Sequence, residues 1–186
     1  MVSPASRQGF FGGSVVFFRS LAAVFAALVL TGCSPEYNWR EVTLADGLVV
    51  AIFPDKPRVQ TKTLPFAGHD IQFSLTGTSL GDAVYAVGHA PLPAAIGNDA
   101  TQRAHIYRQI LLSFYGNFGQ EPPSVLPQPG QRFQIEGNGP SGLIRLEGII
   151  WLHSKSVTEA LVTAPAADYP TEQAAEFLRA VKAPGM

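Results

Sequence analysis

Residues 98–118 read NDATQRAHIYRQILLSFYGNF. The apolar side chains in this stretch recur at steps of three and four, a spacing that places them on one face of a helix. Asn98 or Asp99 can cap the start, because their side-chain oxygens accept hydrogen bonds from free backbone N–H groups. Gly116 or Gly119 can end it. We therefore predict one long helix, whose apolar stripe consists of Ala100, Ala104, Tyr107, Leu111, Phe114 and Phe118.

Segments typical of β-strands lie on both sides of this helix. Five precede it, at residues 39–44, 48–53, 58–64, 71–76 and 83–90, and three follow it, at residues 131–136, 143–152 and 156–163. Their connections are too short for parallel crossovers, so we expect a mostly antiparallel sheet. A second helix at residues 170–182 completes an α+β fold in the order five strands, helix, three strands, helix.

Three short motifs extend this fold assignment. They are Phe53-Pro54-Asp55-Lys56-Pro57, Tyr85-Ala86-Val87-Gly88 and Glu176-Phe177-Leu178-Arg179. With them, residues 39–181 resemble bacterial secreted proteins of the PsbP/Mog1-like fold. The resemblance implies an α/β/α sandwich, in which helices cover both faces of a central antiparallel sheet. Members of that family are assembly factors, binding modules or lipoproteins without a shared catalytic motif, so the resemblance implies no catalytic residue.

The N-terminal residues have the layout of a bacterial export signal. Arg7 and Arg19 form a positively charged start, and an apolar run extends from Leu21 to Leu30. The sequence Leu30-Thr31-Gly32-Cys33 then resembles a lipobox, in which the signal is cut before the cysteine and the cysteine is acylated. We therefore predict a signal peptide at residues 1–32, cleavage between Gly32 and Cys33, a tether at residues 33–38 that is lipidated at Cys33, and a single domain at residues 39–183.

Two alternatives for this segment remain open, a plain cleaved signal and an uncleaved membrane anchor. The anchor is the weaker, because beyond Arg19 the apolar run is shorter than the ~20 residues of a spanning helix. Two or three acyl chains would hold the protein firmly, since burial contributes ~0.8 kcal/mol per CH₂. Ser34 after the cysteine resembles the sorting signal of Gram-negative outer-membrane lipoproteins. We thus expect a lipid-anchored envelope protein on the outer membrane, facing the periplasm.

Composition narrows the classes of function. Cys33 is the only cysteine, so we expect no disulfide, and the fold must rest on burial and hydrogen bonds. Removal of Arg7 and Arg19 with the signal leaves 11 basic residues against 14 acidic ones, a net charge of −3. No basic run with interleaved aromatic residues indicates a nucleic-acid surface, so we expect no nucleic-acid partner.

No catalytic or metal motif stands out. The histidines, at His69, His89, His105 and His153, lack the close pairs that zinc sites use. His89 lies in a strand that should be covered on both faces, which favours a hydrogen-bonded core histidine. Ser141 lies in a glycine-rich turn between two strands, unlike the strand-to-helix turn that presents a hydrolase nucleophile. We expect no metal, no cofactor and no catalytic residue.

Two features could form a binding surface. Arg145, Glu147 and Trp151 share one face of the strand at residues 143–152, because side chains alternate along a strand. They indicate either a ligand-facing groove or a cross-strand ion pair covered by a helix, and the second arrangement is the more common. Tyr115 lies off the stripe of the long helix, so we expect it to be exposed, where an aromatic side chain can serve an interface.

These observations lead to three hypotheses of function. The first is a non-enzymatic, tethered envelope protein whose domain binds or helps to assemble another protein. The second is a periplasmic module that binds a small ligand between sheet and helix, and the third is a hydrolase whose site the sequence does not reveal. An exposed aromatic patch favours the first, an apolar pocket with a few polar groups favours the second, and a perturbed acid–base pair in a cleft favours the third.

Overall fold

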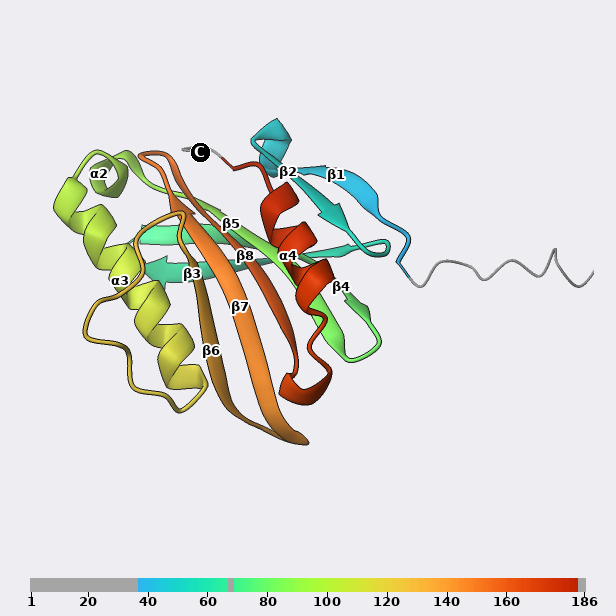
Figure 1. The fold of residues 1–186 in the computed structure, drawn as a ribbon. Helices are drawn as coiled ribbons and strands as arrows, with labels where there is room; N and C mark the ends of the chain where they lie inside the picture. The colour runs from blue at the N-terminus through green and yellow to red at the C-terminus, as the bar shows by residue number, and fades with distance from the viewer. Residues whose placement is uncertain (1–36, 67–68, 184–186) are drawn as a thin grey trace, which may run out of the picture. The chain divides into compact units, whose positions relative to one another are not determined.

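The computed structural model describes residues 37–66 and 69–183, and its strands form two antiparallel sheets (Figure 1). The small sheet pairs β1 (Arg40–Leu44) with β2 (Val49–Phe53). The large sheet has the strand order β3-β4-β5-β8-β7-β6. Its strands are β3 (Arg58–Phe66), β4 (His69–Leu80), β5 (Ala83–Pro91), β6 (Arg132–Gly139), β7 (Gly142–Leu152) and β8 (Ser156–Pro165).

Two main helices accompany the strands, one between β5 and β6 and one after β8. They are α3 (Ala100–Asn117) and α4 (Thr171–Ala180), accompanied by the short α2 (Ala94–Gly97) and the 3₁₀ turns η1 (Ala45–Gly47) and η2 (Ala166–Asp168). The predicted α+β class and the order five strands, helix, three strands, helix are therefore confirmed. The predicted signal peptide, the cleavage site at Gly32 and the lipidated Cys33 lie outside the described residues.

The end of the predicted tether is packed on the fold. Tyr37 stacks on Trp39, with ring centroids 5.6 Å apart. The backbone N–H of Asn38 donates to the carbonyl of Pro54 over 2.8 Å. These contacts hold the chain entering β1 against the turn that follows β2.

Short turns explain why neighbouring strands run antiparallel. Gly81 and Asp82 alone join β4 to β5, and Gly81 has a φ of +55°, a left-handed conformation that glycine adopts without steric cost. The segment between β5 and β6 carries α2 and α3 and takes the chain to the far edge of the sheet. From there β7 and β8 return inward, and β8 pairs with β5. β5 therefore lies centrally, as its apolar sequence predicts.

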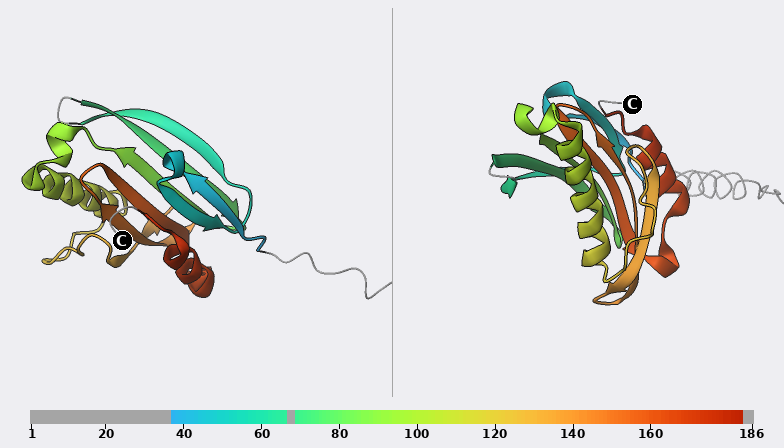
Figure 2. Two further views of the ribbon diagram at one scale, coloured as in Figure 1. Left: turned by 90° about the horizontal axis from the view of Figure 1, so that it is seen from above. Right: turned by 90° about the vertical axis from the view of Figure 1, so that its left-hand side faces the viewer.

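Alternate residues of the central strands face two separate cores. On one face, Tyr85 of β5 and Phe53 of β2 contact the ring of Phe177 in α4, with centroid distances of 5.4 and 5.5 Å. This core joins α4 and the small sheet to the large one. On the opposite face, Leu111 of α3 packs with Ile150 of β7 in a second core. Figure 2 shows α3 and α4 on opposite sides of the sheet.

The long helix packs on the sheet through part of the predicted stripe, since Tyr107 and Leu111 are buried and Phe114 and Phe118 pack against the same core. Asp99 caps it, as one of the two predicted candidates, because its carboxylate accepts from the backbone N–H groups of Thr101 and Gln102. Ala100 and Ala104 are exposed. Alanine buries little area, so the larger side chains further along determine which face meets the sheet. The buried residues of α3 are Ile106, Tyr107, Leu111 and Tyr115.

Candidate functional site

A pocket of about 450 Å³ lies between α3 and the sheet face that this helix covers. Its lining is almost entirely aliphatic and aromatic, and among the described lining residues only Ser113 and Glu159 have polar side chains. The lining residues are Leu64, Pro65, Ile71, Phe73, Gly88, Ala90, Leu92, Ile106, Ile110, Ser113, Phe114, Val157 and Glu159. A concave apolar surface with a very few polar groups is the usual form of a small-molecule site.

Glu159 reaches the pocket through its position on β8. Side chains alternate along a strand, so Val157 and Glu159 face α3 while Ala160 faces α4. Glu159 lies directly opposite Gly88 of β5. A Cβ atom at Gly88 would lie 2.6 Å from Oε1 of Glu159 and 2.7 Å from Cζ of Phe73. The absent side chain of Gly88 therefore leaves the space in which Glu159 and Phe73 lie.

The carboxyl group of Glu159 has neither a hydrogen bond nor an ion pair within the described part of the chain. Burial in this apolar surrounding raises the pKa of Glu159 from its ordinary value of 4.5 to about 7, because low-dielectric surroundings disfavour the charged form. The hydroxyl of Ser113 instead donates to the carbonyl of Ile110 over 2.7 Å. Glu159 is thus the only ionisable side chain among the described residues that line this pocket.

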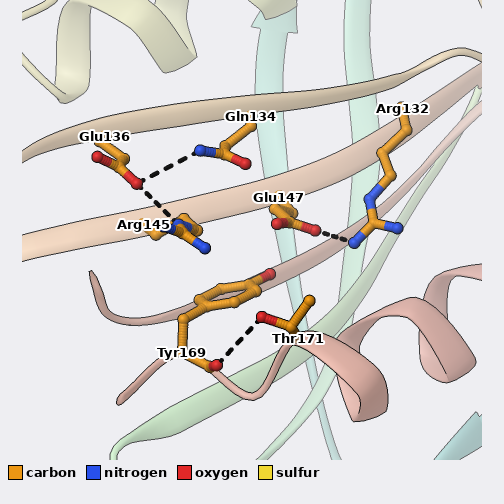
Figure 3. Close-up of polar contacts among 7 residues, drawn as sticks. All are labelled: Arg132, Gln134, Glu136, Arg145, Glu147, Tyr169 and Thr171. Atoms are coloured by element: carbon orange, nitrogen blue, oxygen red, sulfur yellow. Dashed lines mark hydrogen bonds and ion pairs between the residues drawn. The ribbon is translucent and has the colours of Figure 1, made fainter. Parts of the chain in front are cut away.

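Arg145 and Glu147 lie on the opposite face of the sheet, in two cross-strand ion pairs between β7 and β6 (Figure 3). Nε of Arg145 lies 2.8 Å from Oε1 of Glu136, the residue directly across the ladder. The buried Glu147 pairs with Arg132. Of the two arrangements that the sequence leaves open, the structure therefore has the cross-strand ion pairs.

Tyr169, in the segment between η2 and α4, covers these pairs. The guanidinium carbon of Arg145 lies 5.0 Å from the centre of the Tyr169 ring, within reach of a cation–π interaction. The hydroxyl of Tyr169 points toward Glu147 (Figure 3). Burial, and after it the negative charge of Glu147, raises the pKa of Tyr169. Trp151 is 7% exposed in the core on this side, so these residues help to attach the α4 segment to the sheet.

Tyr115 is buried, so the prediction of an exposed aromatic side chain there is wrong. It is 9% exposed and belongs to the core between α3 and the sheet. Tyr115 lies four residues after Leu111, which places both on the same helix face. Phe114, which the prediction assigned to the buried stripe, is only partly buried and lines the pocket. Tyr115 and the pair Arg145 and Glu147 therefore lie on opposite faces of the sheet and do not form one surface.

His89 is a buried, hydrogen-bonded histidine, as the sequence predicts. Its Nδ1 lies 3.0 Å from Oγ1 of Thr158, and the residue is 8% exposed. Burial lowers the pKa of His89, and the charge of Asp46 partly opposes this effect. Because Gly88 faces the pocket, its neighbour His89 faces the other side of the sheet. His89 and Glu159 are therefore separated by the sheet and form no acid–base pair.

Reasoning from the sequence missed Glu159. Two signals were available: a glutamate in the middle of the predicted strand 156–163, and Gly88 inside a central strand. A glycine in a strand interior often marks the close approach of another group. Neither signal indicates that Gly88 and Glu159 are neighbours, because the pairing of β5 with β8 joins segments far apart in the chain.

The described part of the chain shows neither a metal-binding cluster nor a membrane-spanning helix. Among residues 37–66 and 69–183, no three His, Cys, Asp or Glu side chains come together as a metal site would require. Within that same part, no helix combines the length and the apolar character needed to cross a membrane. Models of protein families, curated proteins and solved structures give no match to the chain. Function is therefore inferred from the pocket itself.

Proposed function

We propose that this protein is an envelope-anchored lipoprotein whose α+β domain binds a small apolar ligand in the pocket beneath α3. The observation that carries the proposal is a pocket of about 450 Å³ with aliphatic and aromatic walls and one carboxyl without a partner in the described chain. Binding would remove exposed apolar surface from water, which contributes roughly 25 cal/mol per Å² of buried area. The walls supply affinity, and the single carboxyl supplies orientation.

Ligand binding is better supported than the protein-binding role, which stood first from the sequence. An exposed aromatic patch would favour that role, but Tyr115, the aromatic side chain expected to be exposed, is buried. The charged strip at Arg145 and Glu147 is likewise occupied by its own ion pairs. The pocket, by contrast, has the apolar lining and the polar group that a ligand site requires.

Anchoring and family membership belong to the same proposal. The lipobox Leu30-Thr31-Gly32-Cys33 and the following Ser34 support acylation at Cys33 and an outer-membrane location facing the periplasm. An antiparallel sheet with a main helix on each face supports membership of the PsbP/Mog1-like proteins. In this arrangement the anchor keeps the ligand-binding domain at the membrane surface.

The binding proposal is tested with N-phenyl-1-naphthylamine, a neutral apolar fluorophore, and the full-length chain carrying Cys33→Ala. Its fluorescence should rise on binding and saturate with protein concentration. Ser113 lies on the exposed side of α3 at the pocket, so Ser113→Trp should fill the pocket and abolish the signal. Arg108→Trp is the matched control, because this exposed residue lies ~140° further round the helix. Equal signals from both variants would contradict binding in this pocket.

The anchoring proposal is tested by fractionation of cells that produce the unaltered chain or Cys33→Ala. The unaltered chain should stay with the outer membrane, and Cys33→Ala should lose this association because it lacks the thiol that is acylated. Full retention of Cys33→Ala in the outer membrane would mean that the lipobox interpretation is wrong.

A further inference from the structure

We infer that the ligand is a lipophilic amine, whose apolar body fills the pocket beneath α3 and whose ammonium group pairs with the carboxyl of Glu159. This inference rests on the proposed function and adds the chemical class of the ligand to it. It is carried by the placement of one acidic side chain, without a partner among the described residues, among apolar walls.

Charge complementarity selects the amine. Of the described residues that line the pocket, none is Lys, Arg or His, so an anionic group would enter without a counter-charge. A fatty acid or a phosphate-bearing headgroup would also place its negative charge beside Glu159. An ammonium group instead supplies donors to an acceptor that has none, and charge-assisted hydrogen bonds are the strong class of such contacts.

The surroundings of Glu159 favour a single contact between a charged ligand group and the pocket. Gly88 leaves the space that Glu159 occupies, and the side chain of Phe73 lies beside that space. The hydroxyl of Ser113 is already bonded to the carbonyl of Ile110. A ligand with one cationic end and an apolar body therefore matches one carboxyl group surrounded mainly by hydrocarbon, whereas a polyamine or a sugar would bury further polar groups with few partners.

The ionisation of Glu159 supports the same conclusion. Burial raises its pKa to about 7, so the empty pocket holds the carboxyl partly protonated near neutral pH. The lining residues described here include no second titratable side chain. A bound ammonium group would favour the carboxylate, because an adjacent opposite charge offsets the cost of burial.

The experiment compares decylamine, decanol and decanoate as competitors of N-phenyl-1-naphthylamine on the full-length chain with Cys33→Ala at pH 7.5. Decylamine should compete at least about tenfold more strongly than decanol, and decanoate more weakly than both. The preference for the amine should disappear in Glu159→Gln, which keeps the shape but not the charge. Glu176→Gln, an exposed glutamate on α4, is the control and should keep the preference.

The outcomes separate the two proposals. If the fluorophore binds the unaltered pocket but the amine has no advantage over the alcohol, the amine inference is wrong and the apolar-ligand proposal stands. If the fluorophore itself does not bind, the proposed function fails. Lysophosphatidylethanolamine, which carries an amine beside a phosphate, tests whether the amine belongs to a lipid headgroup. If it competes as strongly as decylamine, the ligand is an aminolipid, and our exclusion of phosphate-bearing headgroups is wrong.

Discussion

Replacement of Glu159 by glutamine should make the domain more stable at alkaline pH and leave its stability unchanged at acid pH. Burial raises the pKa of Glu159 from 4.5 to about 7 in the folded state, whereas the unfolded chain keeps the ordinary value. Between these two values the folded state holds a proton that the unfolded state releases. The stability that this group contributes is therefore complete below pH 4.5 and is lost progressively as the pH rises through about 7.

The size of this gain in stability follows from the pKa values of Glu159 in the folded and unfolded states. Their difference of about 2.5 corresponds to about 3 kcal/mol, at about 1.36 kcal/mol for each unit of pKa. Glutamine has nearly the same shape and cannot ionise, so Glu159→Gln avoids this loss. The variant should match the unaltered protein near pH 4.5 and exceed it by up to about 3 kcal/mol at pH 8.

Urea unfolding followed by tryptophan fluorescence at half-unit steps from pH 4.5 to pH 8 measures the difference. His89 acts in the opposite direction, because its lowered pKa makes the folded state less stable as the pH falls below 6.5. That contribution is common to both proteins and cancels in the comparison. Glu176→Gln, exposed on α4, should stay within about 0.5 kcal/mol of the unaltered protein at every pH. A difference between Glu159→Gln and the unaltered protein that is constant with pH would refute burial of the carboxyl.

Three further predictions concern stability, measured by urea or thermal unfolding. Gly88→Ala should lower the free energy of unfolding by about 1–3 kcal/mol, because its Cβ would lie 2.6 Å from the carboxyl of Glu159. Gly116→Ala, whose Cβ meets open space on α3, should instead raise it by about 0.5–1 kcal/mol. Equal effects of the two substitutions would contradict the packing at Gly88. Asp99→Ala removes the cap of α3 and should cost about 1 kcal/mol, and an unchanged midpoint would argue against the cap. Phe177→Ala should cost about 3–5 kcal/mol, because its side chain is fully buried between α4 and the sheet; a loss below 1 kcal/mol would mean that this core is loosely packed.

Local patterns in the sequence were sufficient for the elements and their order. Residue alternation identifies strands, helical spacing identifies the long helix, and short turns impose antiparallel pairing, since each of these signals acts over a few neighbouring residues. The cap at Asp99 and the buried His89 followed in the same way. The stripe of α3 followed only in part, because several faces of that helix carry apolar side chains and only docking on the sheet selects between them. Tyr115 was misplaced for this reason.

The candidate site depended on strand pairing, which no local pattern encodes. Glu159 and Gly88 become neighbours only when β8 inserts beside β5. The same pairing turns Arg145 and Glu147 away from α3 and toward the other core. Local sequence thus determined the elements of this protein and its predicted export signal. The tertiary structure decided that Glu159, which has no partner in the described part of the chain, lies in an apolar pocket, because burial and cross-strand contacts are properties of the assembled sheet.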